Sequence, residues 1–195
     1  MEARKLPPKA IEYTYEEYLT WPEEERWEMI EGVTELMASP AFEHQWLLLE
    51  LASEFRNHLR GKPCIPIMAP MDVRLENKRD HGKDTVLQPD LMVVCDRSKI
   101  EKNFIMGAPD FVLEVLSPST EIRDLTVKMR KYLQAGVQEY WVLDPIEQTL
   151  QVYLLIEGTY RLQIYERTDQ VPVQTVEGLI IHMSALFPDD LTIPS

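Results

Sequence analysis

The sequence lacks long hydrophobic runs. Every apolar run falls short of the roughly 20 residues that a membrane-spanning helix requires, so no membrane span is expected. The first stretch, MEARKLPPKAIEY, has no apolar core of the kind found in secretion signals. Nothing in the chain therefore indicates a membrane protein or a secreted one.

Cysteine is also scarce. The two cysteines, Cys64 and Cys95, belong to no CxxC motif and no Cys/His array. This pattern argues against a zinc knuckle and against a disulfide scaffold. We therefore expect a cytoplasmic protein in a reducing compartment.

Basic residues are outnumbered. The 20 Lys and Arg residues face 33 Asp and Glu residues, for a net charge of −13. This balance argues against a protein that coats nucleic acid by bulk electrostatics, because phosphate contacts need clustered Lys and Arg. It leaves open an enzyme that meets phosphates through a metal, since carboxylate-rich sites are acidic until a cation arrives.

What the sequence does contain is an ordinary globular composition in 195 residues, with 45% hydrophobic and 27% charged residues. Residues 1–12, which include Pro7 and Pro8, predict a flexible N-terminal arm. Residues 13–195 have no internal repeat and fit a single domain.

Periodicity and turn residues outline the elements. Thr14 and Glu17 form a capping-box signature for a short helix that ends near Pro22. A helix over 39–59 and another after Ser119 or Thr120, ending at Gly136, show helical spacing of apolar residues. Strands are predicted around a turn at Glu31–Gly32 and over the ranges 64–76, 86–96, 109–116, 139–144 and 149–166, the last as a hairpin, before a final short strand and helix. The order predicts a mixed α/β fold.

Two acids interrupt strands that are otherwise apolar. Glu114 lies within PDFVLEVL, and Asp90 lies within VLQPDLMVV. A buried carboxylate costs several kcal/mol, on the order of a desolvated ion, unless something positive meets it. Adjacent strands lie about 4.8 Å apart, so the two acids could share one Mg²⁺. Asp110 lies four residues from Glu114 along the same strand, about 13 Å away, which is too far to share that ion.

Structural explanations compete with this one. Asp90 could cap the entry of its strand, and Glu114 could pair with an Arg or Lys, as buried ion pairs elsewhere do. Lys128 borders the apolar side of its helix and can lean toward the sheet, but an Asp124–Lys128 ion pair explains it equally well. His44 faces inward and fits a core histidine, while Glu28, taken alone, fits a surface strand residue.

Taken together, these segments resemble the Uma family of endonucleases, within the PD-(D/E)XK restriction-endonuclease-like superfamily. The matching stretches run in the family's order over about residues 13–188: YTYEEYL, RWEMIEG, FEHQ, QPDLMVVCD, GAPDFVLEVLSPST, RDLTVKMRKYLQAGVQEYWVLDP and EGLIIHMSALFP. The segment that begins PDFVLEVLSPST and ends EYWVLDP is a specific signature.

The resemblance implies a central mixed sheet flanked by helices, with an appended C-terminal hairpin. It implies DNA as substrate and a Mg²⁺ or Mn²⁺ site with Asp90 and Glu114 as ligands, Glu28 as an outer or second-metal ligand and His44 as a contributor. Leu116 occupies the position at which the superfamily motif has its lysine. The resemblance therefore implies that Lys128, on the following helix, takes the role of that lysine.

Some features of the sequence leave function open. The −13 charge also fits a non-catalytic binding module on a nuclease-derived fold. The apolar hairpin around LQVYLLIEG could cover a second subunit in a homodimer. Positive charge is modest and local, on a helix and on a loop: Arg123, Lys128, Arg130 and Lys131, and Lys78, Arg79 and Lys83.

Overall fold

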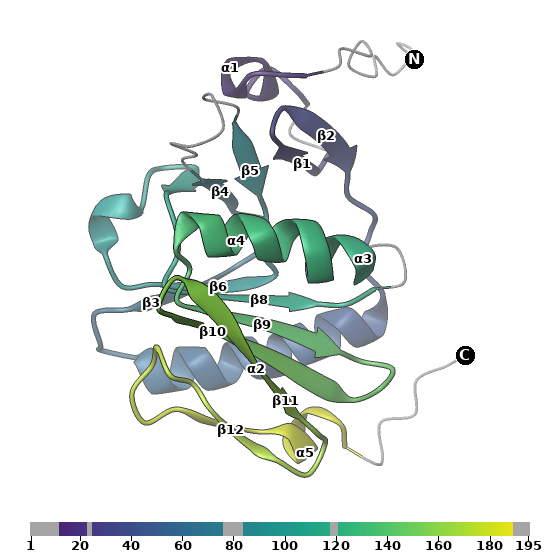
Figure 1. Cartoon of the computed structure of the whole chain (residues 1–195), viewed down its shortest axis with the longest axis vertical. Coiled ribbons are helices and arrows are strands. Elements are labelled where there is room, and N and C mark those ends of the chain that lie inside the picture. Colours follow the sequence, from purple (N-terminus) through teal and green to yellow (C-terminus); the bar gives the residue numbers. More distant parts are fainter. Residues whose placement is uncertain (1–11, 23–24, 76–83, 118–120, 189–195) are drawn as a thin grey trace.

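The computed structural model describes residues 12–22, 25–75, 84–117 and 121–188 (Figure 1). A six-stranded sheet lies at the centre with helices on both faces, and a five-stranded sheet lies above it in the view of Figure 1. No helix in these ranges is long and apolar enough to cross a bilayer. The predicted arm falls outside them, apart from Glu12.

The central sheet has the strand order β11-β10-β9-β8-β6-β3. Its strands are β3 Ile65–Met68, β6 Leu91–Val94, β8 Phe111–Val115, β9 Glu139–Asp144, β10 Thr149–Ile156 and β11 Thr159–Tyr165. The strands β8 and β9 are parallel, and the other neighbours are antiparallel. A parallel pair needs a crossover, and the helical segment between β8 and β9 supplies it.

Helices cover both faces of this sheet. On one face lies α2, Phe42–Leu59, whose buried residues Leu47, Leu51 and Phe55 pack against Phe111 and Leu113. On the other lie α3, Glu121–Arg123, a π-helical turn over Asp124–Lys128 and α4, Met129–Ala135. Figure 1 shows α4 in front of the sheet and α2 behind it.

Strand alternation divides the two cores. Phe111, Leu113 and Val115 of β8 belong to the core under α2, whereas Val112 belongs to the core under α4 with Tyr132. This strand is thus covered on both faces. Because side chains alternate along a strand, Glu114 shares the face of Val112, under the α3–α4 segment.

The five-stranded sheet has the order β2-β1-β5-β4-β7. Its strands are β1 Trp27–Ile30, β2 Val33–Leu36, β4 Asp72–Leu75, β5 Thr85–Leu87 and β7 Phe104–Met106. The helix α1, Tyr15–Tyr18, begins with the predicted capping box between Thr14 and Glu17.

This second sheet corrects three predictions. The range 86–96 was expected to be one strand, but its residues divide between β5 in this sheet and β6 in the central sheet. The range 64–76 was expected to be one strand but forms β3 at the edge of the central sheet and β4 in the other sheet. β3 lies at the edge of its sheet, consistent with Pro66 within it. The range 97–108, for which no strand was predicted, contains the short strand β7.

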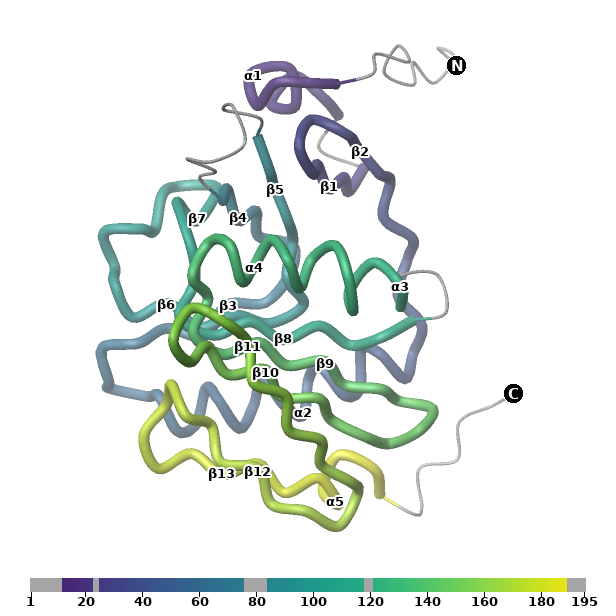
Figure 2. Tube along the Cα trace, viewed as in Figure 1, coloured from purple at the N-terminus to yellow at the C-terminus, as the bar shows by residue number. Residues whose placement is uncertain are grey.

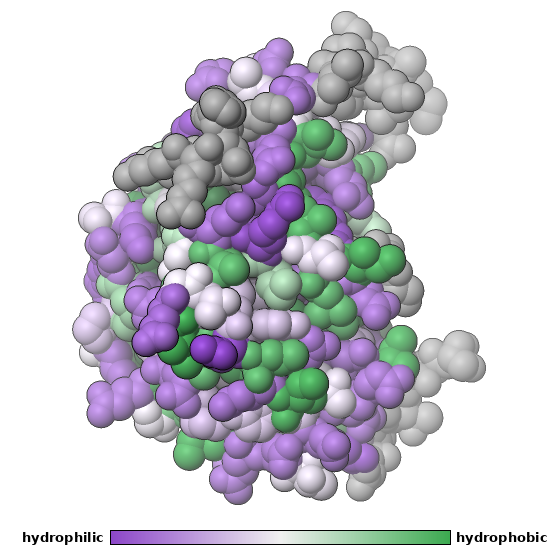
Figure 3. Space-filling model, viewed as in Figure 1, coloured by the Kyte–Doolittle hydropathy of each residue, from purple (hydrophilic) through white to green (hydrophobic). Residues whose placement is uncertain are grey.

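The C-terminal part follows the prediction of a hairpin. β10 and β11 pair along their length around a turn at Glu157 and Gly158, both with positive φ. Two short strands, β12 Gln170–Pro172 and β13 Ile180–His182, pair before α5, Met183–Leu186. Leu162 and Ile164 of β11 are exposed, in a region where Figure 3 shows hydrophobic residues at the surface. The homodimer that this hairpin suggested stays a prediction.

The two cysteines form a disulfide, Cys64–Cys95. They flank paired strands, since Ile65 lies opposite Val94 in the register of β3 and β6. One bridge beside two hydrophobic cores does not make a disulfide scaffold. However, the pairing was not foreseen, and it removes the cysteine argument for a reducing compartment.

Gly136 ends α4 as predicted, with φ of +89° and its N–H bonded to the carbonyls of Tyr132 and Leu133. A Cβ at this position would meet nothing within 4 Å. The substitution Gly136→Ala therefore tests backbone strain alone, and we expect it to lower the free energy of unfolding by about 1 kcal/mol. Urea denaturation measures this loss, and Gln134→Ala at an exposed helical position is the control, expected within about 0.5 kcal/mol of wild type. Equal stability of the two variants would contradict the assignment.

Candidate active site

A cleft of about 550 Å³ opens where the two sheets meet. It lies between the β1–β2 hairpin, the start of α2, the ends of β6 and β8, and the α3–α4 segment. Figure 2 traces these segments, which are far apart in the sequence. Among the described residues that line the cleft, the acidic ones are Glu28, Glu35, Glu43, Asp90, Glu114, Glu121, Asp124 and Asp144 and the basic ones are Arg26, Arg123 and Lys128.

Glu114 is 3% exposed and is bonded on one oxygen. Its Oε1 accepts hydrogen bonds from Lys128 Nζ at 3.1 Å and from the Tyr132 hydroxyl at 2.8 Å. Lys128 is thus the positive partner that the interrupted strand requires. Glu114 Oε2 accepts no hydrogen bond from the described residues.

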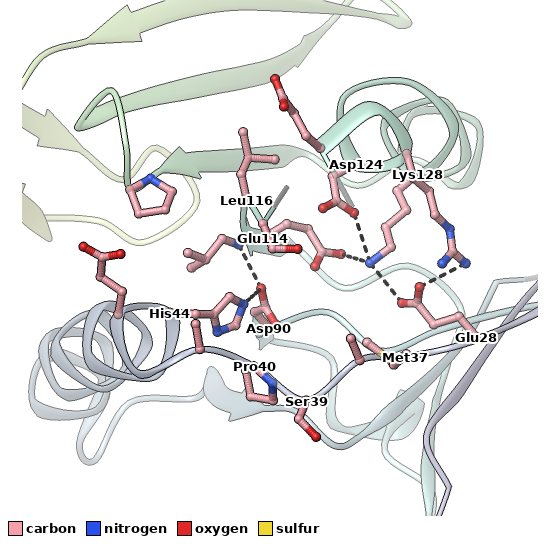
Figure 4. Close-up of a pocket in the computed structure, with 18 of the residues that line it drawn as sticks. Glu28, Met37, Ser39, Pro40, His44, Asp90, Glu114, Leu116, Asp124 and Lys128 are labelled. Carbon is pink, nitrogen blue, oxygen red and sulfur yellow. Dashed lines mark hydrogen bonds and ion pairs between the residues drawn. The ribbon is translucent and has the colours of Figure 1, made fainter. Parts of the chain in front are cut away.

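Lys128 lies at the centre of a carboxylate cluster. Its Nζ is 3.0 Å from Glu28 Oε1, 3.1 Å from Glu114 Oε1 and 3.3 Å from Asp124 Oδ1 (Figure 4). The predicted lean toward the sheet and the competing Asp124–Lys128 pair are therefore both present. The π-helical turn over 124–128 buries the two residues together, and such turns are frequent at functional sites.

Glu28 is 1% exposed, which corrects the surface position expected for it in isolation. Its Oε1 accepts from the Gln88 N–H and from Lys128, and its Oε2 accepts from Arg123 at 3.1 Å. Arg123 also pairs with Glu35 at 2.9 Å. Both oxygens of Glu28 are thus bonded by the protein, and Glu28 holds Lys128 in place. Its role as a metal ligand stays a prediction.

Asp90 lies beside Glu114, one step beyond the Leu91–Leu113 pair of β6 and β8. Its Oδ2 accepts from the Val115 N–H at 2.8 Å and from His44 Nε2 at 3.0 Å. A carboxylate only accepts, so His44 carries a proton on Nε2, and Nδ1 faces no partner among the described residues. Figure 4 shows Asp90 between His44 and Glu114.

The electrostatics of the cluster show an excess of negative charge. Burial raises the pKa of Glu114 well above its usual value, against the pull of Lys128 and with further raising by Asp124, Asp90 and Glu28. The same carboxylates raise the pKa of Lys128, although burial opposes this. Lys128 therefore stays charged while Glu114 resists ionisation.

These groups fit a hard divalent cation. Oδ1 of Asp90 and Oε2 of Glu114 accept no bond from the described residues, and they belong to neighbouring positions. No group of three or more Asp, Glu, His and Cys among the described residues is arranged to hold a metal. Mg²⁺ commonly binds through one or two carboxylates and keeps several waters, so a pair of acids suffices.

Other predicted residues have other roles or lie elsewhere. Asp110 accepts from the Cys95 N–H, away from Lys128, as expected for the excluded acid. The loop lysines and arginine, Lys78, Arg79 and Lys83, and the helix caps Ser119 and Thr120 lie outside the described residues.

Several contacts in the cleft were not predicted from the sequence. Tyr132 on Glu114, and Arg123 on Glu28 and Glu35, were not assigned to the site. The helical offset from Lys128 to Tyr132 was a usable signal. No local pattern linked Arg123 to a hairpin about 90 residues earlier.

The sequence model of the Uma2 family, described as "Putative restriction endonuclease", matches residues 15–184. This chain belongs to the Uma2 family. "Uncharacterized protein slr1290" of Synechocystis is 30% identical over 176 residues, 88% of this chain and 90% of that protein. A crystal structure from Anabaena variabilis, described as "a putative nuclease belonging to DUF820", is 26% identical with a TM-score of 0.74, over 89% of this chain and 97% of that one.

The comparisons confirm the predicted family and the restriction-endonuclease-like α/β fold. They also support a nuclease-like function for this Uma2 protein.

Substitution of Lys128 tests how much the ion cluster contributes to the stability of the fold. We expect Lys128→Met to lower the free energy of unfolding at pH 8 by about 3 kcal/mol, because Glu28, Glu114 and Asp124 lose their shared cation. Acidification from pH 8 to pH 5 should shrink this deficit. Removing the cation takes away the group that lowers the pKa of Glu114, so the folded variant binds more protons than its unfolded chain as pH falls.

Urea denaturation at both pH values measures the deficit. Arg130→Met, at an exposed position of the same helix, is the control and should stay within about 0.5 kcal/mol of wild type. A Lys128→Met protein as stable as wild type at pH 8 would refute the buried ion cluster.

Proposed function

We propose that this Uma2 protein is a metal-dependent endonuclease that hydrolyses DNA phosphodiester bonds. The observation that supports it best is the neighbouring pair Asp90 and Glu114 at one end of a cleft, with Lys128 bonded to Glu114. Buried acids beside a charged lysine are the components from which metal-assisted hydrolysis is built.

Asp90 and Glu114 would hold Mg²⁺ or Mn²⁺ through Oδ1 and Oε2. When bound, such an ion lowers the pKa of a coordinated water and polarises a phosphoryl oxygen. The Val115 N–H and His44 fix the Asp90 carboxylate, and Lys128 and Tyr132 fix that of Glu114. The protein thereby orients both ligands before any substrate enters.

Lys128 would stabilise negative charge that develops on the phosphate, or orient the attacking water. Its position depends on Glu28, which accepts bonds from Arg123 and from the Gln88 N–H. His44 would donate a hydrogen bond from Nε2 to Asp90, and its Nδ1 would accept a hydrogen bond from water. We give Glu28 the role of positioning Lys128.

A binding module without catalysis is the second candidate, and the charge of the cleft favours it. Eight acidic residues against three basic ones line the cleft among the described residues, and the whole chain carries −13. An acidic cleft repels a polyanion unless cations enter it. The two candidates therefore differ in whether a divalent ion binds and whether DNA is cut.

The first prediction concerns metal binding. Titration of Mn²⁺ into the protein, followed by calorimetry, should show one binding event that Asp90→Asn abolishes, because that variant loses a charged ligand oxygen. Glu43→Gln, which removes an exposed acid from the cleft lining, should bind as wild type does. Identical isotherms for wild type and Asp90→Asn would contradict a metal site at Asp90.

The second concerns cleavage. Supercoiled plasmid should be nicked in the presence of Mn²⁺ and left intact in EDTA, and Glu114→Gln should lower the rate at least about 100-fold, the scale of a lost charge-stabilising group. The Glu43→Gln variant again serves as control. If purified wild type cuts no DNA while it binds Mn²⁺, the binding-module candidate replaces the endonuclease.

A further inference from the structure

Arg26 lies on the same side of the β1–β2 hairpin as Glu28. It directly precedes β1, and its carbonyl accepts the Met37 N–H, so hairpin pairing continues to this residue. Side chains two residues apart on an extended strand share a face, at about 7 Å. Arg26, Glu28, Glu35 and Met37 accordingly all line the cleft.

Gln88 fixes the guanidinium of Arg26. Gln88 Oε1 accepts from Arg26 Nε at 2.9 Å, while Gln88 Nε2 donates to Asp72 Oδ1 at 2.8 Å. The two bonds define which end of the amide is oxygen, and the Gln88 N–H is in turn bonded to Glu28. Arg26 is therefore tied to the residue that holds Lys128, but through its Nε alone.

The cations of the cleft differ in what they bind. Lys128 contacts three carboxylates, and Arg123 contacts Glu28 and Glu35. Arg26 has no carboxylate within ion-pair distance among the described residues, and its buried NH2 group has no hydrogen-bond partner there. A buried charged donor without an acceptor costs free energy, and native proteins normally satisfy such groups.

We infer that Arg26 is a phosphate-binding residue, whose guanidinium holds a backbone phosphate of a DNA strand in the cleft. The guanidinium lines the cleft with no carboxylate of the described residues paired to it, and its planar fork suits a phosphate. Binding here places one cation against the polyanion on the hairpin side, without disturbing the Lys128 cluster. That the bound anion is a DNA phosphate rests on the proposed function.

Fluorescence anisotropy with labelled 16-nucleotide DNA, single-stranded and duplex, tests this in Ca²⁺ so that no cleavage is needed. An RNA strand of the same sequence separates the two sources of phosphate. Affinity is measured between 50 and 200 mM salt for wild type, Arg26→Gln and the control Arg161→Gln, an exposed residue of β11. Circular dichroism and thermal melting verify folding.

We expect Arg26→Gln to bind DNA about 10-fold more weakly, with the slope of log K against log salt reduced by about 0.7 to 0.9, the value for one phosphate contact. Arg161→Gln should match wild type. If Arg26→Gln does not fold, Arg26→Lys replaces it. That variant keeps the charge and hence the slope, but it cannot bond Gln88 and reach the phosphate together, so its affinity should fall at least about threefold.

A folded Arg26→Gln protein with wild-type affinity and slope overturns the inference. If Arg26→Lys is the variant used, a folded protein with wild-type affinity also overturns it. Tighter binding of RNA than of DNA overturns it too, as does a wild-type protein that binds no DNA. Arg26-dependent binding without Mn²⁺-dependent cleavage sustains this inference and removes the endonuclease proposal, so the two failures are distinct.

Discussion

One ammonium group, Lys128 Nζ, lies within 3.3 Å of three carboxylates from three separate parts of the chain. None of Glu28, Glu114 and Asp124 could stay ionised and buried alone, because a desolvated charge without a partner costs several kcal/mol. The lysine therefore joins the hairpin of one sheet, a strand of the other and the crossover helix. The cleft exists where these three meet.

The rest of the site follows from that arrangement. The parallel pair β8 and β9 requires a crossover, and the crossover brings Lys128 over the face where Glu114 points. The antiparallel pair β6 and β8 brings Asp90 next to Glu114, and the start of α2 brings His44 to Asp90. Each element is ordinary in itself, and the cluster of acids around Lys128 forms where the elements converge.

Local patterns predicted what depends on local physics. An acid in an apolar strand identified Glu114 and Asp90, and the apolar spacing of the crossover helix placed Lys128 toward the sheet. The capping box at Thr14, the turn at Glu157–Gly158 and the end of α4 at Gly136 were likewise predictable from the residues. In contrast, the partners of buried Glu28 all lie far away in the sequence: the Gln88 N–H, Arg123 and Lys128. A short strand carries no sign of so distant a partner. The split of 64–76 between two sheets, the disulfide and the π-helical turn also depend on tertiary contacts.

The central claim is that Asp90 and Glu114 share a divalent cation. A crystal of the wild-type protein soaked in Mn²⁺, with data collected at the manganese edge, tests it most directly. The account predicts an anomalous peak about 2.1 to 2.2 Å from Asp90 Oδ1 and Glu114 Oε2, close to the octahedral Mg²⁺ distance, with Lys128 still bonded to Glu28. Well-ordered carboxylates with no anomalous peak between them would contradict it.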